Sequence, residues 1–251
     1  MTRLAYRVSI PSPATQRLTV ELTAEGLLPG DALLSMPRWA PGWYVLREYS
    51  RNVESIRART LAGREVPVAK DGVSTWRIRK GRGGSVVVSL SIHAPKWGDA
   101  YSFVDASHAS LFGPSVFPWI HGTEQEPATL AIDAPAAWGQ VSSGLEPVDG
   151  DPRLRAADDY DHLIDAPIEI GNHEVHEFEA GGKPHELAIV GGPIPTDRGK
   201  ITADLAKIVE ETGRMFGELP YDRYVFLLYV TPEPTGSLEH RNSTTFTMLP
   251  A

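Results

Sequence analysis

The chain has 251 residues, with 24 Lys and Arg against 32 Asp and Glu, and it contains no cysteine. The absence of cysteine excludes disulfides, a thiol nucleophile, a zinc ribbon and an iron–sulfur cluster. The net charge of −8 argues against nucleic acid or an anionic membrane as the main partner, and a hydrophobic content of 41% is enough for a folded core.

The start of the chain lacks the apolar core of a signal peptide. Strand-like alternation begins directly after Met1, and no run reaches the roughly 18 apolar residues of a membrane span. We therefore expect a cytoplasmic protein of bacterial type without a membrane-spanning segment.

The segment 1–170 carries the pattern of short β-strands. Apolar residues recur at even spacing in 8–10 and 18–22, as half-buried strands require, and Gly83-Gly84 precedes a β-branched run at 86–92 as in a hairpin. The other strands predicted here are 73–78, 128–132 and 161–170. Many short strands separated by glycine and proline turns predict a β-sandwich or an open, saddle-like sheet.

The segment 171–251 shows a different, mixed pattern. Strands at 173–178 and 186–190 precede a predicted helix at 197–216, with Thr196 as its N-cap and Gly217 as its C-terminal stop. Helical spacing places six apolar residues on one face: Ile201, Leu205, Ile208, Val209, Met215 and Phe216.

A nearly continuous apolar strand follows at 224–230, which predicts burial on both faces. An extended stretch then runs from 237 to 248, and no second helix is predicted to cover the buried strand. We therefore expect an N-terminal β domain at 1–180 and the incomplete start of an α+β domain at 181–251. Exposed apolar surface on the 224–230 strand would favour self-association.

Two groups of polar residues resemble catalytic sets only superficially. His173 and His176 are three residues apart in a predicted strand, so they point to opposite faces, whereas a zinc-binding helix places two histidines four residues apart. Asp105, Ser107 and His108 supply the residue types of a catalytic triad, but three nearby residues rarely reach triad geometry. We therefore expect neither a metal site at the two histidines nor a catalytic triad at the second group.

The segment 36–53 combines four aromatic residues with two prolines and a cluster of charged residues. One interpretation is an aromatic core patch beside the Pro41-Gly42 turn. A second is a sugar-stacking platform built on Trp39 and Trp43. A third is an anchor to another domain, in which the charged residues pair among themselves or across an interface: Arg47, Glu48 and Arg51.

The segment 234–243 has the pattern of a short strand after a proline-rich loop. Leu238 and His240 would share one face of this strand, with Ser237 and Glu239 on the other. An edge strand can bind an extended peptide by β-addition, and a carboxylate on it could hold the terminal ammonium of that peptide. An exposed Glu239 beside Arg241, without a function, is the alternative.

Three ordered motifs together resemble the glycyl-aminopeptidase family, zinc metallopeptidases of the gluzincin type that usually carry a PDZ domain. They are the Met36–Val53 segment, Asp165-Ala-Pro-Ile-Glu-Ile-Gly171 and Gly236-Ser-Leu-Glu-His-Arg-Asn-Ser243. The resemblance spans nearly the whole chain. It implies an N-terminal β domain up to about residue 180, followed by the start of a thermolysin-like catalytic domain.

The resemblance also implies roles for the residues of the last motif. Glu239 would bind the free α-amine of a peptide substrate, and the backbone of Gly236, Ser237 and Leu238 would pair with that peptide. Ser237 stands where the family has Gly, which would narrow the first pocket. His240 stands where related aminopeptidases have Asn, and no role is carried over to it.

The family's HExxH zinc helix has no counterpart in these 251 residues. The implied whole enzyme uses zinc and a bound water to remove small N-terminal residues such as Gly or Ala from peptides. We expect this chain alone to recognise a substrate N-terminus, to bind no zinc and to cleave nothing. The alternatives are a β-rich module that binds carbohydrate or protein through the aromatic segment, and a scaffold in which Glu239 has no concave surroundings.

Overall fold

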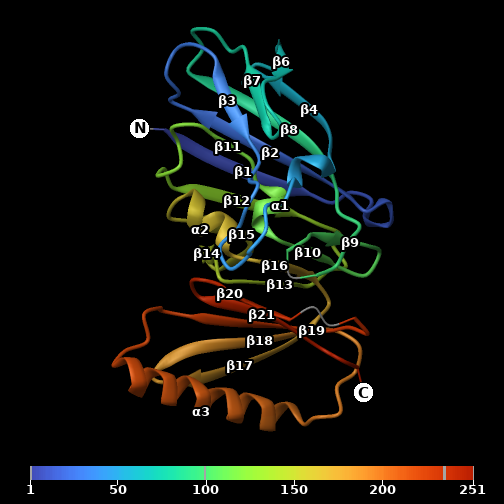
Figure 1. Ribbon diagram of the computed structural model, residues 1–251, viewed down its shortest axis with the longest axis vertical. Helices are drawn as coiled ribbons and strands as arrows, with labels where there is room; N and C mark the ends of the chain where they lie inside the picture. The colour runs from blue at the N-terminus through green and yellow to red at the C-terminus, as the bar shows by residue number, and fades with distance from the viewer. Residues whose placement is uncertain (1, 99, 234–235, 251) are drawn as a thin grey trace.

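A computed structural model describes residues 2–98, 100–233 and 236–250, so Pro234 and Thr235, which precede the last motif, lie outside the described residues. Within these ranges the chain is mainly β, with four sheets and three α-helices. Figure 1 shows two parts one above the other: a large β part that ends at Gly171, and a single sheet with a long helix below it.

The largest sheet has eight strands, in the order β14 (Glu146–Val148), β15 (Asp151–Ala157), β12 (Ala128–Asp133), β1 (Arg3–Ser9), β2 (Arg17–Glu25), β8 (Ser85–His93), β4 (Val53–Arg59) and β5 (Glu65–Val66). Its pairing is antiparallel except for β1 and β12, which run parallel. Regular alternation of buried and more exposed residues along β2 is what one covered face of such a sheet requires.

Two four-stranded sheets complete the upper part. One has the order β11 (Trp119–Ile120), β3 (Ala32–Ser35), β7 (Thr75–Ile78) and β6 (Val68–Lys70). The other, which lies closer to the lower sheet in Figure 1, has the order β13 (Gln140–Ser143), β16 (Ile168–Gly171), β10 (Ala109–Leu111) and β9 (Phe103–Val104). The short helices α1 (Gly113–Val116) and α2 (Tyr160–Asp165) contact each other beside these sheets.

Helix α2 corrects the predicted strand at 161–170. Asp159 caps this helix by accepting a hydrogen bond from the backbone N–H of His162, so residues 160–165 turn into a helix. Only Ile168–Gly171 of the predicted stretch is a strand. The apolar residues do alternate in this stretch, but the N-cap at Asp159 stabilises a helix in place of the predicted strand.

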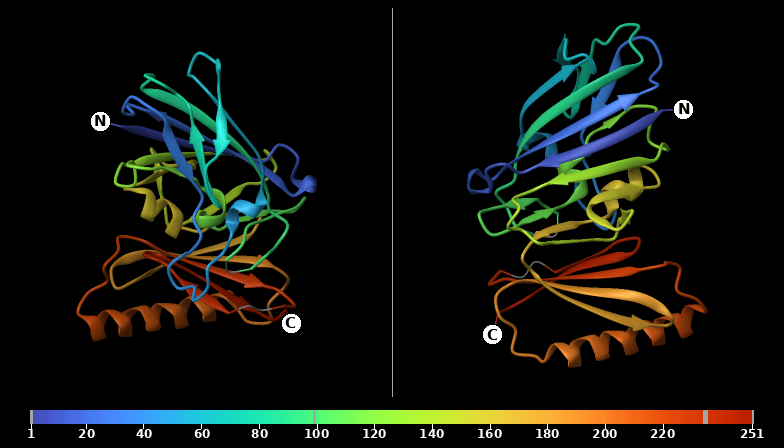
Figure 2. Two further views of the ribbon diagram at one scale, coloured as in Figure 1. Left: turned by 45° about the horizontal axis from the view of Figure 1, so that its top comes forward. Right: turned by 180° about the vertical axis from the view of Figure 1, so that it is seen from behind.

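The lower sheet has five strands, in the order β17 (Glu174–Ala180), β18 (Lys183–Gly191), β19 (Tyr224–Val230), β21 (Ser243–Met248) and β20 (Ser237–Glu239). Strands β18, β19 and β21 are mutually parallel, and β17 and β20 run antiparallel at the two edges. Figure 2 shows helix α3 (Arg198–Phe216) along one face of this sheet and the upper part of the molecule against the other face.

The predicted helix at 197–216 is confirmed, with two differences. Asp197, rather than Thr196, is the N-cap, because its side chain accepts from the N–H of Lys200, and Gly217 ends the helix with a left-handed φ of 87°. Only part of the apolar stripe packs on the sheet, including Ile201 and Leu205. The other end of the helix leaves three side chains 60–74% exposed: Ile208, Met215 and Phe216.

Strand β19 is buried, which corrects the expectation that it would expose apolar surface. Leu228 and Val230 belong to a core cluster beneath α3. Val225, Leu227 and Tyr229 form a second cluster on the opposite face, against which Trp97 of the upper part packs. The upper β part therefore covers the face of β19 for which the sequence offered no second helix.

Candidate functional site at the edge strand

The candidate peptide-binding strand β20 lies at one edge of the lower sheet. Its three residues pair with β21 in antiparallel register, Ser237 opposite Phe246, Leu238 opposite Thr245 and Glu239 opposite Thr244. In the described ranges of the chain the other edge of β20 has no strand beside it. The backbone groups that point to that edge are therefore not used by another strand of the described chain.

The residues of β20 point as their alternation predicts. Leu238 is buried, whereas Ser237 and Glu239 are exposed. Gly236, which precedes the strand, has a φ of 124°, a conformation that side-chain-bearing residues rarely adopt. Among the described residues no group donates a hydrogen bond to the Glu239 carboxylate, so this anion remains free to receive a cation.

Tyr224 lies close to this carboxylate on the neighbouring part of the sheet. Its hydroxyl donates to the backbone oxygen of Ser243 at 3.0 Å. Burial raises the pKa of Tyr224 to about 12, and the nearby Tyr221, Glu239 and Asp165 add to the shift. The phenol therefore stays neutral at physiological pH, and it places a second polar group near Glu239.

The residues that follow Glu239 attach to the upper part of the molecule. The carboxylate of Asp165, at the end of α2, accepts a hydrogen bond from His240 Nδ1 at 3.0 Å and one from the Arg241 backbone N–H at 2.7 Å. The side chain of Asn242 donates to the Gly144 carbonyl at 2.8 Å. The imidazole of His240 is only 3% exposed, and its Nε2 has no hydrogen-bond partner among the described residues.

The aromatic segment 36–53 also reaches β20. A methyl group placed on Gly42 would lie 2.4 Å from Leu238 Cδ1, so the Pro41-Gly42 turn packs directly over this side chain. Leu238 belongs to the core cluster of the upper β part, although its strand belongs to the lower sheet. The segment therefore makes a contact between the two parts, as its interpretation as an anchor predicts.

The side chains of the segment do not pair as the sequence suggested. Glu48 pairs with Arg38 at 2.5 Å, and Arg47 lies over the Trp43 ring, 5.1 Å from its centroid. Trp43 packs partly against the core, whereas Trp39 is 50% exposed and donates its ring N–H to the Trp43 carbonyl. With Arg47 on the face of Trp43, the two tryptophans do not share an open platform.

A cavity of about 670 Å³ lies between the aromatic segment and the residues around Asp165 and Arg241. Its lining combines aromatic and charged side chains, among them Trp39, Trp119, Tyr160, Asp161, Asp165 and Arg241. The cavity reaches Arg241, two residues after Glu239, but no residue of β20 lines it.

Sequence reasoning missed a group of buried titratable residues between the two parts. Glu169 of β16 is fully buried, and burial raises the pKa of its carboxyl well above the usual range despite the hydroxyls of Ser110 and Tyr229 nearby. Burial also lowers the pKa of His108, and it lowers the pKa of His173 to about 4. The apolar neighbours of Glu169 in the chain were the available signal for its burial.

The residues of the superficial catalytic sets do come together, but not in catalytic order. Ser107 Oγ donates to Asp105 at 2.6 Å and lies 2.9 Å from His108 Nδ1. The serine thus stands between the acid and the imidazole, whereas a triad needs the imidazole between the other two. His176 Nε2 contacts Glu174 at 2.6 Å. No group of three or more potential ligands that could hold a metal occurs among the described residues.

None of the described helices is long and apolar enough to cross a membrane.

Comparison with known proteins gives a family and a fold. Residues 5–172 match the Peptidase M61 N-terminal domain. No curated protein matches the chain. A crystal structure described as an aminopeptidase N family protein from Idiomarina loihiensis is similar over 98% of this chain, with a TM-score of 0.91 and 30% sequence identity.

A more distant similarity extends to native yeast LTA4 hydrolase, with a TM-score of 0.55 and 13% identity over 98% of this chain. At that identity the likeness concerns the fold alone. The chain spans 42% of the Idiomarina protein and 40% of the yeast protein.

Proposed function

The chain belongs to the peptidase M61 family, and from this premise we propose that it is the N-terminal portion of a zinc-dependent aminopeptidase. In this proposal the whole enzyme removes small N-terminal residues of the Gly or Ala type from peptides. The chain itself recognises the substrate N-terminus and does not hold the zinc. One observation carries the proposal: the exposed residue Glu239 lies on a strand at the edge of its sheet.

The residues of β20 would bind the peptide in two ways. The peptide adds as a further strand along the free edge of β20. Gly236 already bonds to Thr247 through its N–H and its carbonyl, so the alternation of an antiparallel ladder leaves the backbone of Ser237 and Glu239 to supply the hydrogen bonds to the peptide. Glu239 receives the α-ammonium group through a charge-assisted hydrogen bond. A substrate whose N-terminus is blocked loses this bond, and this loss would make the enzyme an exopeptidase.

The described residues do not fit a zinc site, since no three potential ligands converge. In the proposal the zinc ligands, with the HExxH helix and any PDZ domain, belong to a longer protein that contains this chain. The N-terminal β domain, predicted for residues 1–180, then ends near Gly171, because β17 (Glu174–Ala180) pairs with β18 in the lower sheet. The lower sheet and α3 are the beginning of a thermolysin-like domain, predicted for residues 181–251. The proposed partner is a peptide with a free N-terminus, in the cytoplasm.

Replacing Glu239 with Gln in a longer protein that contains this chain tests the proposal. We expect kcat/KM for glycyl and alanyl anilides to fall by roughly 10- to 100-fold, because a hydrogen bond to a charged group contributes about 1.5–3 kcal/mol. E179Q is the matched control, since Glu179 is exposed on β17 at the opposite edge of the same sheet. Unchanged kinetics of E239Q would refute the role of Glu239.

A further inference from the structure

Two motifs that are distant in the sequence meet at Asp165. Both oxygens of this carboxylate are used: Oδ1 contacts His240 Nδ1 at 3.0 Å, and Oδ2 accepts from the Arg241 backbone N–H at 2.7 Å. These two groups immediately follow Glu239, the last residue of β20. The contact therefore joins the end of α2 in the upper part to the end of the candidate substrate strand.

The chemistry of this contact fixes its direction. An ionised carboxylate only accepts hydrogen bonds, so the proton of the His240 ring lies on Nδ1. The His240 side chain is 3% exposed and that of Asp165 is 23% exposed, so water competes little for this bond. Two charge-assisted bonds to consecutive residues hold the backbone more firmly than a single contact to one side chain.

Strand β20 needs such an attachment. It has only three residues and pairs on one side only, so its own ladder gives it little resistance to fraying. The Pro41-Gly42 turn packs on Leu238 in the middle of the strand, and Asp165 holds the chain at its end. Both contacts therefore hold the strand that carries Glu239.

We propose that Asp165 is a positioning residue, which fixes the place of Glu239 by clamping His240 and Arg241. This inference rests on the proposed function, because it assigns to Asp165 the orientation of the carboxylate that receives the substrate amine. The upper β part then contributes to catalysis through the substrate strand, without touching the reacting atoms. A misplacement of about 1 Å in such a group can reduce the rate by about 100-fold.

Asp158 offers a matched control on the same side of the molecule. Its carboxylate lies 3.1 Å from Arg241 Nη2, and both side chains are more than half exposed. D158N therefore removes an interaction of Arg241 without touching its backbone or His240. A general loss of contact between the two parts would affect both variants, whereas positioning through the backbone predicts an effect of D165N alone.

The first measurement uses the chain by itself and needs no activity. We expect D165N to speed hydrogen exchange at the Arg241 amide at least tenfold and to change the nitrogen chemical shifts of the His240 ring, because Asn cannot accept at both positions. D158N should leave both signals as in the wild type. Wild-type exchange and ring shifts in D165N would overturn the clamp, whatever the enzyme does.

The second measurement uses the longer enzyme. We expect D165N to lower kcat/KM for alanyl anilides about tenfold or more, with D158N near the wild-type value. H240A should show the same loss and H240N should recover most of it, because the Asn amide places an N–H at the position of Nδ1. If D165N does not fold, the comparison of H240A with H240N still tests the positioning role. An altered exchange with unchanged kinetics would overturn the positioning role, and wild-type kinetics of E239Q would instead refute the proposed function.

Discussion

Glu169 is the residue whose burial has the clearest energetic consequence. Its carboxyl is 0% exposed between the two parts of the molecule, next to the hydroxyls of Ser110 and Tyr229. A charge at that place would lose its hydration, so burial raises the pKa of the carboxyl and favours its protonated form in the folded protein. The family motif at 165–171 thus contains two acids with opposite roles, since Asp165 is a hydrogen-bond acceptor at the surface of the interface.

The raised pKa of Glu169 predicts a pH-dependent stability. The folded chain retains a proton that the unfolded chain releases above about pH 4.3, so the free energy of unfolding falls as the pH rises from there towards the folded-state pKa, by at most about 1.4 kcal/mol per pH unit. E169Q removes this pH dependence. As the pH rises, the free energy of unfolding of E169Q should therefore increase relative to that of the wild type. Urea unfolding at a series of pH values measures the difference.

E177Q serves as the control for this experiment, since Glu177 is exposed on β17. Its stability should follow the wild-type curve because its carboxylate stays in water. Parallel curves for E169Q and the wild type would mean that Glu169 is ionised in the folded protein, contrary to the prediction.

For single residues, the sequence predicts which side chains are exposed better than it predicts which side chains contact each other. Alternation along a strand correctly put Leu238 on one face and Ser237 and Glu239 on the other, and the structure buries the first and exposes the other two. Alternation could not identify Asp165 as the partner of His240, because a contact between positions so distant in the sequence depends on how two sheets are stacked. Within the aromatic segment, Glu48 pairs with Arg38 rather than with Arg47 or Arg51, because the path of the loop, which residue types do not specify, decides which charges meet.

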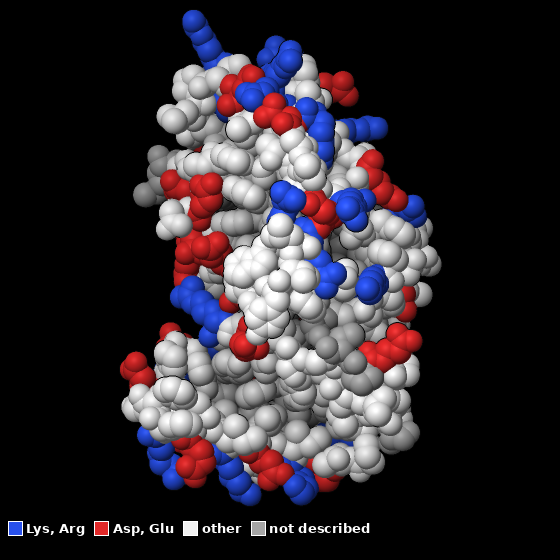
Figure 3. Space-filling model, viewed as in Figure 1, with Lys and Arg blue, Asp and Glu red and all other residues white. Residues whose placement is uncertain are grey.

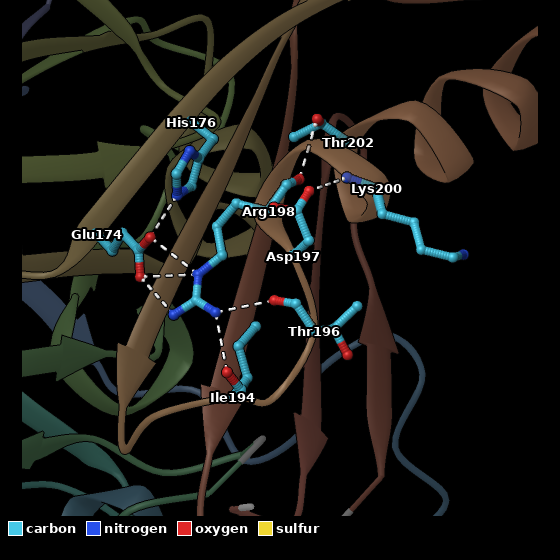
Figure 4. Close-up of polar contacts among 8 residues, drawn as sticks. All are labelled: Glu174, His176, Ile194, Thr196, Asp197, Arg198, Lys200 and Thr202. Carbon is cyan, nitrogen blue, oxygen red and sulfur yellow. Dashed lines mark hydrogen bonds and ion pairs between the residues drawn. The ribbon is translucent and has the colours of Figure 1, made fainter.

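Helix α3 makes several polar contacts at its N-terminal end, whereas its C-terminal end leaves apolar side chains exposed. Figure 4 shows Arg198, the first helical residue, between the carboxylate of Glu174 on β17 and the carbonyls of Ile194 and Thr196. Asp197 caps the same turn through Lys200. Charged side chains of both signs cover the outer surface of this helix along the lower edge of Figure 3, which favours its contact with water.

The N-cap gives a prediction for this element. D197A should lower the free energy of unfolding by about 1 kcal/mol, because the N–H of Lys200 loses its acceptor. E210A, in the exposed middle of the helix, is the control and should stay within about 0.5 kcal/mol of the wild type. Urea unfolding followed by far-UV circular dichroism measures both. Equal stability of D197A and the wild type would show that another group caps the helix.

The sequence predicts a helix or strand correctly where one local signal dominates. It fails where two signals, such as strand-like alternation and a helix cap, favour different structures. The helix at 197–216 has a long apolar period and clear ends, and it is found with a shift of one residue at the cap. Residues 161–165 have the alternation of a strand, but the cap at Asp159 makes them helical. The burial of β19 by the upper part has a different cause. It depends on a part of the chain that lies distant in the sequence and includes Trp97.

The whole molecule is held together by polar contacts as well as by apolar packing between its two parts. Arg223, which precedes β19, donates to the Ser143 carbonyl of β13 at 2.8 Å and to Glu186 of β18 at 2.7 Å. Trp97 packs edge-on against Tyr229, with ring centroids 5.7 Å apart. Separation of the two parts would break the contact with Ser143 and expose the aromatic pair, so it carries a free-energy cost.

This coupling predicts that the two parts unfold together, although the chain is longer than the roughly 150 residues below which single transitions are usual. All six tryptophans lie before residue 139, whereas α3 lies in the lower part. Tryptophan fluorescence and helical circular dichroism therefore report on different parts, and their urea transitions should coincide. R223A removes the contact with Ser143 across the interface and should shift the helical transition to lower urea, away from the fluorescence transition. R214A, on the exposed surface of α3, should keep the two together, and separate transitions in the wild type would show that the parts are independent.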